Sequence, residues 1–225
     1  MGAGRDLETP QGSGELYLAY GDDIPDFERR PAFTGDIYKL SPDRSVALVQ
    51  HPCAMRRGVQ MAPKLLVCEV KVNRDGVPSD WSAGHFKRMF LPELAGESFV
   101  IEFEEIDVVT REELRAAERL AILSNRGVNL LVQRWLFHNS RVVVPTITIN
   151  AQASGPFEEA DLIQEASDGL VDSGTTIDEA QALVDTWLGE SPGEGSPSRR
   201  DLLSDPQQRS VVRSGLRRQL RDWVG

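Results

Sequence analysis

The sequence predicts an α+β protein in which a small β-barrel is followed by helices. Short apolar segments separated by turn residues fill the first half of the chain, which is typical of a small barrel or sandwich. Near residue 110 the hydrophobic period changes from that of strands to that of helices. With 225 residues, the chain is long enough for one core of ordinary size with appendages, or for two small domains.

The barrel domain is expected over residues 31–152, after a flexible N-terminal arm at residues 1–30. Within the arm, only residues 16–20 have the composition of a strand. Five core strands are predicted from apolar or alternating runs, at residues 35–40, 46–49, 65–72, 86–91 and 99–103.

Two helices are predicted to follow these strands. Thr110 and Glu113 form a capping-box pattern, and apolar residues recur at helical spacing from Leu114 to Ala121. A second helix carries apolar residues from Val128 to Leu136 on one face. Residues 141–149 are rich in β-branched side chains and are expected to return to the barrel as an edge strand.

The C-terminal part divides by charge into three segments. Residues 157–190 are predicted as two acidic helices, the second beginning at Thr176 with Glu179 completing a capping box. Residues 191–198 have the composition of a linker, and residues 199–225 form a basic amphipathic helix. Asp205 followed by Pro206 is a helix-start pattern inside that last segment.

The formal net charge of −10 excludes a uniformly basic nucleic-acid-binding protein but leaves room for a local basic patch. Two cysteines are too few for a disulfide framework. No apolar run approaches the roughly 18 residues of a transmembrane helix. We therefore expect a cytoplasmic protein that neither uses a membrane nor needs a cofactor.

Short motifs resemble the PemK/MazF-type toxin family. Gly35, Asp36 and Ile37 resemble the opening of that family's first strand, and residues 46–49 resemble its second strand. Residues 106–124 resemble its closing strand and helix entry. The resemblance covers about residues 33–140, and it implies an SH3-like barrel with appended helices and an endoribonuclease activity.

The family's catalytic pattern is not clearly kept. Arg44 precedes the second strand without the arginine–proline pair, and residues 71–73 offer no hydroxyl after the third strand. The loop from His51 to Gly58 also differs from the usual toxin loop. The resemblance thus implies the fold more strongly than catalysis.

That loop carries two of the three candidate catalytic residues, His51 and Arg56. RNA cleavage needs a base for the 2′-hydroxyl and a cation for the phosphorane. His51 or His85 is the candidate base and Arg56 the candidate stabiliser. A nucleophilic Cys53, or a metal site of His51 and Cys53 joined by Cys68 and His85, is a weaker alternative; the spacing matches no standard zinc pattern, so no metal is expected.

Four cations are candidates for nucleic-acid binding: Arg56, Arg57, Lys87 and Arg88. The alternative for the arginine pair is that both side chains bind the chain's own surplus carboxylates. Residues 81–90 interleave aromatic and basic side chains, as a base-stacking surface does. The alternative there is a strand with Phe86 and Phe90 facing the core.

The last helix is the candidate partner-binding element, through Arg213, Leu216, Arg217, Leu220 and Trp223. Its arginines would either pair with the acidic helices of the same chain or meet a partner.

The sequence therefore supports two functions. The first is a nucleic-acid-directed module of a bacterial toxin–antitoxin or phage-defence type system, with RNA as the partner and RNA cleavage as its sharpest form. The alternative is a non-catalytic interaction or regulatory subunit that binds a protein through residues 157–225. A homodimer is compatible with both.

Overall fold

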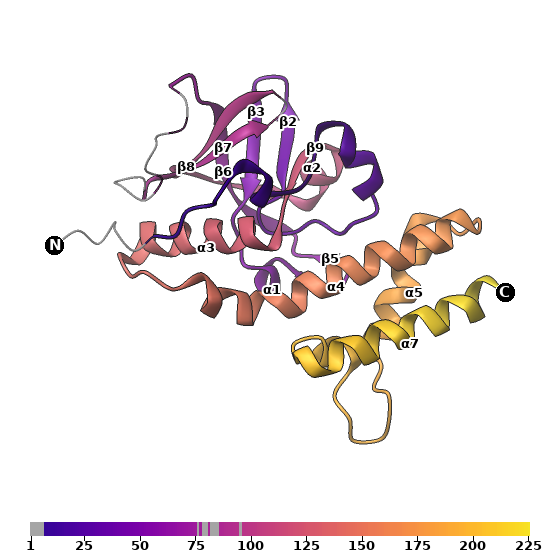
Figure 1. Ribbon diagram of the computed structural model, residues 1–225. Helices are drawn as coiled ribbons and strands as arrows, with labels where there is room; N and C mark the ends of the chain where they lie inside the picture. Colours follow the sequence, from indigo (N-terminus) through magenta and orange to yellow (C-terminus); the bar gives the residue numbers. More distant parts are fainter. Residues whose placement is uncertain (1–6, 76, 78–80, 82–85, 95) are drawn as a thin grey trace. The chain divides into compact units, whose positions relative to one another are not determined.

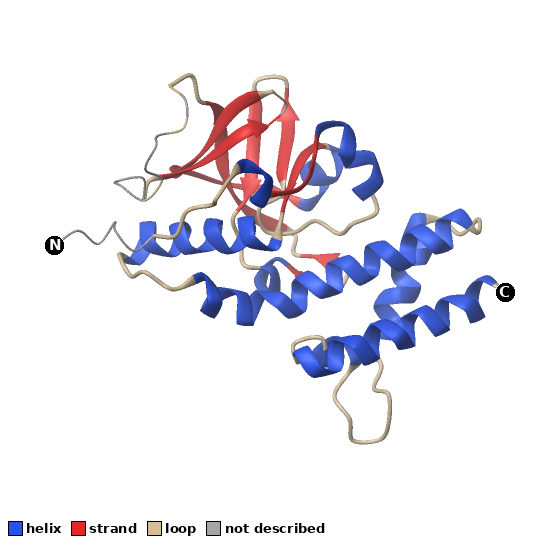
Figure 2. Cartoon of the chain, viewed as in Figure 1, coloured by secondary structure: helices blue, strands red, loops and turns tan. Residues whose placement is uncertain are grey.

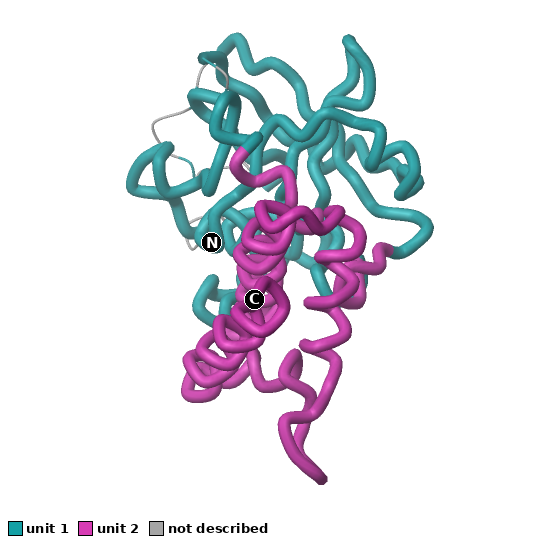
Figure 3. The backbone as a smooth tube through the Cα atoms, turned by 90° about the vertical axis from the view of Figure 1, so that its right-hand side faces the viewer, with its two compact units in different colours: residues 1–25, 33–55, 62–150 teal, residues 26–32, 56–61, 151–225 magenta. Residues whose placement is uncertain are grey.

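The computed structural model describes residues 7–75, 77, 81, 86–94 and 96–225 (Figures 1 and 2). The chain divides into two compact units, each built from separate segments of the sequence (Figure 3). We call them the barrel unit (residues 1–25, 33–55 and 62–150) and the helical unit (residues 26–32, 56–61 and 151–225).

The barrel unit contains a seven-stranded antiparallel sheet with the order β1-β9-β2-β3-β6-β8-β7. The first and last strands of this order approach each other, because Tyr17 Oη of β1 donates to the Pro92 carbonyl of β7 at 2.9 Å. The sheet is therefore a nearly closed barrel, and the predicted α+β fold class is confirmed. Its strands are β1 (Tyr17–Tyr20), β2 (Ile37–Ser41), β3 (Arg44–Leu48), β6 (Lys64–Val72), β7 (Arg88–Leu94), β8 (Glu97–Thr110) and β9 (Glu118–Leu123).

Strand burial follows the apolar runs of the sequence. Val46, Ala47 and Leu48 of β3 are fully buried, and β3 pairs with β6, where Leu65 and Val67 are also fully buried. All five predicted core strands and the strand in residues 16–20 are confirmed, with ends that differ by up to seven residues, because β8 continues to Thr110.

Short helices complete the barrel unit. The predicted capping box at Thr110 is present in α2, and Ser124 caps α3 by accepting from Gly127 N at 3.0 Å. The elements are η1 (Ser13–Glu15), η2 (Gly21–Phe27, which ends in the helical unit), α1 (Pro52–Met55), α2 (Arg111–Ala116) and α3 (Asn125–Ser140).

The helix predicted to run from Thr110 to Ala121 is wrong in its second half. α2 ends at Ala116, and the chain continues as β9, which pairs with β1 on one side and β2 on the other. Ala121, Ile122 and Leu123 are buried by this pairing. An apolar run this short is compatible with both helical and strand periodicity. Here the pairing with β1 and β2 makes the segment a strand.

The edge strand predicted at residues 141–149 is also wrong, because α4 (Thr146–Asp172) begins there. Glu8, far away in the sequence, satisfies the start of this helix: its carboxylate accepts from Thr146 N at 2.8 Å and Thr146 Oγ1 at 2.6 Å. Burial raises the pKa of Glu8, but the bonds from Thr146 and Arg126 outweigh it and hold that pKa at about 2.

The helical unit contains the rest of α4, a hairpin of β4 (Arg56–Arg57) and β5 (Gln60–Met61), and the helices α5 (Ile177–Gly189), α6 (Arg199–Leu202) and α7 (Pro206–Val224). The predicted capping box at Thr176 and the N-cap at Asp205 are confirmed. Its core joins α4, α5 and α7 through Leu162, Ile163, Ala166, Leu170, Ala180, Val184, Trp187, Leu188, Leu203, Val212 and Leu216. Among the described residues, no helix combines the length and apolar character needed to cross a lipid bilayer.

We predict that Glu8→Gln lowers the free energy of unfolding at pH 7 by about 1 kcal/mol, the usual value of a helix cap. The pKa of Glu8 is depressed in the folded state, so its contribution is complete above its ordinary pKa of about 4.5 and is lost as the pH falls towards 2. Urea unfolding across this pH range is the measurement. The exposed Glu97→Gln is the control, and a gap between Glu8→Gln and wild type that stays constant with pH would contradict the account.

Candidate functional site

The loop after β3 belongs to the barrel unit as far as Met55. His51 is half-buried, and its Nδ1 accepts a hydrogen bond from Cys53 N at 3.3 Å. Burial lowers the pKa of His51, which disfavours its protonated form. His85, the other candidate base, lies outside the described residues.

The two cysteines are unpaired. Cys53 is exposed, whereas Cys68 is buried in β6, where burial and the nearby Glu69 raise the pKa of its thiol to about 12. Cys68 is therefore a core residue rather than a nucleophile. In the part of the chain that the structure describes, no three His, Cys, Asp or Glu side chains are grouped as metal ligands.

Arg56, the candidate phosphate stabiliser, is built into the helical unit. Its side chain is 3% exposed and donates to the Gly58 carbonyl at 2.5 Å and to the Pro156 carbonyl at 3.1 Å. The Glu159 carboxylate lies 4.0 Å from Arg56 Nη2 and is itself 8% exposed. Burial lowers the pKa of Arg56, and Glu159 opposes this effect. The expectation that this arginine stands open at a barrel mouth is thus corrected, whereas its neighbour Arg57 is exposed.

Glu159 connects this arginine to α5. Its other ion pair is with Arg200 Nε at 2.8 Å, and Arg200 Nη2 contacts Asp185 of α5 at 2.5 Å. Asp185 also accepts from Val59 N at 3.3 Å, on the turn of the β4–β5 hairpin. We call Arg56, Glu159, Arg200 and Asp185 the ion network; the first two side chains are buried and the last two are partly exposed.

Gly58 lets the hairpin turn approach this network. Its φ is +60°, and a Cβ atom there would stand 1.7 Å from Asp185 Oδ1. Only glycine accommodates both the left-handed backbone and the contact.

Lys87 and Arg88, the other nucleic-acid candidates, lie at the start of β7. Lys87 Nζ is 2.7 Å from Glu104, and Arg88 Nη2 is 3.4 Å from Glu102. Both basic side chains are about half exposed, at 52% and 42%. Each cation is therefore accessible but already faces a carboxylate.

The aromatic residues beside these cations pack inward. Phe90 is buried and Phe86 is half-buried, with its ring against Phe137 at 5.9 Å between centroids. Trp81 is buried, with the Arg134 guanidinium 5.1 Å from its ring centroid. This placement favours the core interpretation for Trp81, Phe86 and Phe90 over a base-stacking surface.

The candidate partner residues of α7 divide into two sets. Arg213 Nη2 lies 2.6 Å from Glu158, and Arg217 Nε lies 2.8 Å from Glu165, both on α4. These ion pairs favour the alternative in which the arginines of α7 bind the acidic helices of the same chain. Leu216 is 1% exposed in the core of the helical unit, whereas Leu220 and Trp223 are only partly buried against it.

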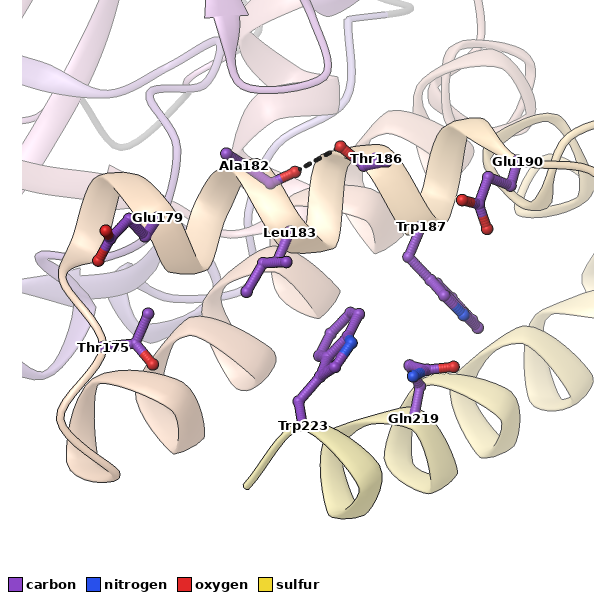
Figure 4. A pocket seen from close by; sticks show the side chains of 9 residues that line it. All are labelled: Thr175, Glu179, Ala182, Leu183, Thr186, Trp187, Glu190, Gln219 and Trp223. Atoms are coloured by element: carbon purple, nitrogen blue, oxygen red, sulfur yellow. Dashed lines mark hydrogen bonds between the residues drawn. The ribbon is translucent and has the colours of Figure 1, made fainter. Parts of the chain in front are cut away.

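An open groove runs between α5 and α7 within the helical unit (Figure 4). Its volume is about 650 Å³, within the range of ligand-binding sites. Trp223 points from α7 towards Leu183 of α5, and Trp187 points from α5 towards α7 (Figure 4). The lining residues are Thr175, Glu179, Ala182, Leu183, Thr186, Trp187, Glu190, Gln219 and Trp223.

Local packing holds one tryptophan of this groove in place. The Arg199 guanidinium lies 4.3 Å from the Trp187 ring centroid and donates to the Trp187 carbonyl at 2.9 Å. A Cβ atom at Gly215 of α7 would stand 3.4 Å from the Trp187 ring, so the absence of a side chain there leaves room for the indole. The groove wall is therefore preformed.

Of the residues that line the groove, only Trp223 is a sequence-predicted site residue. The sequence pattern identifies Glu179 only as a capping residue, although Leu183, Thr186 and Glu190 share its helical face. The exposure of Leu183, 41%, was not readable from the sequence because it depends on where α7 packs. In comparisons with known proteins, the chain matches no family model and no curated protein.

We predict that Gly58→Ala destabilises the protein more than Gly21→Ala does. Both glycines have a φ near +60°, but nothing lies within 4 Å of a Cβ at Gly21. The backbone cost is therefore shared, and the displacement of Asp185 adds about 1 to 3 kcal/mol at Gly58 alone. Urea unfolding of the two variants measures the difference, and equal losses would contradict the close approach.

Proposed function

We propose that this protein is a non-catalytic interaction subunit that binds a partner protein at the α5–α7 groove of its helical unit. The observation that carries the proposal is a preformed, open groove walled by two tryptophans and an exposed leucine.

Apolar exposure in this groove supports docking. Leu183 is 41% exposed, and Trp223 is only partly buried. Large aromatic side chains beside a concave apolar surface are the usual anchors of protein interfaces. Leaving them open to water costs stability, which a binding partner would recover by covering them.

The arginines expected to act on RNA are occupied elsewhere, and this also supports an interaction role. Arg56 makes its bonds to protein groups inside the helical unit, where its side chain is almost wholly buried. A buried guanidinium that binds two carbonyls and a carboxylate is a structural element. Binding at the groove needs none of these groups to move.

Nucleic-acid binding and RNA cleavage stay predictions of the sequence. Lys87 and Arg88 are accessible, but Glu104 and Glu102 reduce the positive potential that a phosphate backbone would meet there. We therefore rank this function, and a toxin–antitoxin or phage-defence role with it, below partner docking.

We predict that a photo-crosslinking amino acid at position 183, installed in the full chain and expressed in the native host, yields one defined protein adduct. Trp223→Ala in the same chain should reduce the adduct at least about fivefold, because truncating an interface aromatic typically costs more than 1 kcal/mol. Mass spectrometry of the adduct is the measurement.

The matched control carries the same amino acid at Val108, which is 50% exposed on β8 of the barrel unit. An identical adduct at both positions, or one indifferent to Trp223→Ala, would contradict groove docking. An adduct with RNA in place of protein would favour the nucleic-acid function over partner docking.

A further inference from the structure

The α5 wall of the groove is one continuous helical face. Its lining residues recur three or four positions apart, which places them on one side of the helix over about three turns, or about 16 Å. α7 supplies the opposite wall through Gln219 and Trp223, one turn apart. A third helix is the element whose side chains match ridges spaced in this way.

The charged groups of the groove lie at its two ends. Of the lining residues only Glu179 and Glu190 are ionisable, and Ala182, Leu183 and Thr186 lie between them. Figure 4 shows the two carboxylates at opposite ends of the α5 wall, with Leu183 and Trp187 between them. The α5 wall is thus apolar or neutral at its centre and anionic at both ends.

Each carboxylate keeps one oxygen available. Glu179 Oε2 accepts from Thr176 N and Thr176 Oγ1, at 3.2 and 2.7 Å. Glu190 Oε2 accepts from Arg199 Nη1 at 3.2 Å. Within the described part of the chain, no hydrogen bond reaches Oε1 of either glutamate, so each can accept one from a bound cation.

The surrounding charge favours a cationic occupant. Residues 157–194 contain eleven Asp or Glu and no Lys or Arg. Eight of these acids pair with arginines, whereas Asp178 and Glu179 at the start of α5 form no ion pair within the described part of the chain. Arg199 is close to the groove but is engaged with Glu190 and Trp187, and the last turns of α7 expose Arg218, Arg221 and Asp222. The α5 wall is therefore most negative at its N-terminal end.

We propose, resting on the docking function above, that the occupant is an amphipathic helix of a partner protein with a Lys or Arg at each end of its apolar stripe, about three turns apart. The stripe packs on Leu183 and Trp223, and the two cations bind Glu179 and Glu190. The apolar contact provides affinity, while the paired charges fix the register of the helix and exclude acidic helices.

The test uses two synthetic helices of about five turns with the same leucine stripe. One carries two lysines three turns apart, and the other carries glutamates at those positions. Fluorescence anisotropy with the full-length protein at low salt should give about tenfold tighter binding of the lysine helix. High salt should reduce the preference, because exposed ion pairs are screened.

Three variants locate the effect. Glu179→Gln with Glu190→Gln should remove most of the preference, and glutamine at position 179 still serves a capping box, so α5 keeps its start. Glu194→Gln, an exposed carboxylate outside the groove, should retain it. Trp223→Ala should weaken both helices equally.

Equal affinity of the two helices for the wild-type protein would overturn the cationic occupant. The crosslinking experiment at position 183 tests partner docking independently of this result. Failure of both helices to bind, or binding that Trp223→Ala leaves unchanged, would overturn a helical occupant of this groove. A protein that self-associates through the groove would show a dimer by sedimentation that Leu183→Glu dissociates, and this result would likewise overturn the proposal.

Discussion

The helical unit depends on the buried pair of Arg56 and Glu159. Removing the Arg56 side chain leaves the buried Gly58 carbonyl and the partly buried Pro156 carbonyl without this donor, at about 1 to 3 kcal/mol for each unsatisfied group, while Glu159 keeps its ion pair with Arg200. The exposed pairs that join α7 to α4, such as Arg217 with Glu165, contribute about 1 kcal/mol or less each. The buried pair therefore decides whether β4 stays on α4, and the surface pairs only adjust the position of α7.

The same network positions the groove. Glu159 also binds Arg200, and Arg200 binds Asp185 on α5, so the burial of Arg56 is connected through three ion pairs to a groove wall. A second buried arginine, Arg30, binds Asp161 and lies 4.9 Å from the Phe157 ring. Both arginines come from the first quarter of the sequence, so residues 151–225 alone lack two of the groups that hold their helices. The proposed docking groove and the ion network are thus parts of one unit.

The sequence predicted the features that depend on interactions between neighbouring residues, such as helix starts. Thr110 with Glu113, Thr176 with Glu179, and Asp205 with Pro206 each satisfy amide groups of their own helix, and all three helix starts are confirmed. The features that the sequence did not predict depend on residues far apart in the chain. β9 exists because β1 and β2 pair with it, and α4 begins at Thr146 because Glu8 accepts its first amide. Arg56 looked like an exposed loop residue because the carbonyl and carboxylate that bury it lie 100 residues or more further along the chain. The groove escaped prediction for a related reason: the exposure of Leu183 depends on the packing of α7, which no pattern within α5 encodes.

The most direct test compares Arg56→Ala with Arg57→Ala, two adjacent arginines of the same hairpin strand, one buried and one exposed. Urea unfolding followed by far-UV circular dichroism measures the free energy of unfolding, and RNA cleavage is assayed on the same samples. We expect Arg56→Ala to lose about 2 to 6 kcal/mol and Arg57→Ala to stay within about 0.5 kcal/mol of wild type, with no RNA cleavage by either variant or the parent. An Arg56→Ala protein as stable as Arg57→Ala, combined with RNA cleavage by the parent that this variant has lost, would contradict the structural role of Arg56.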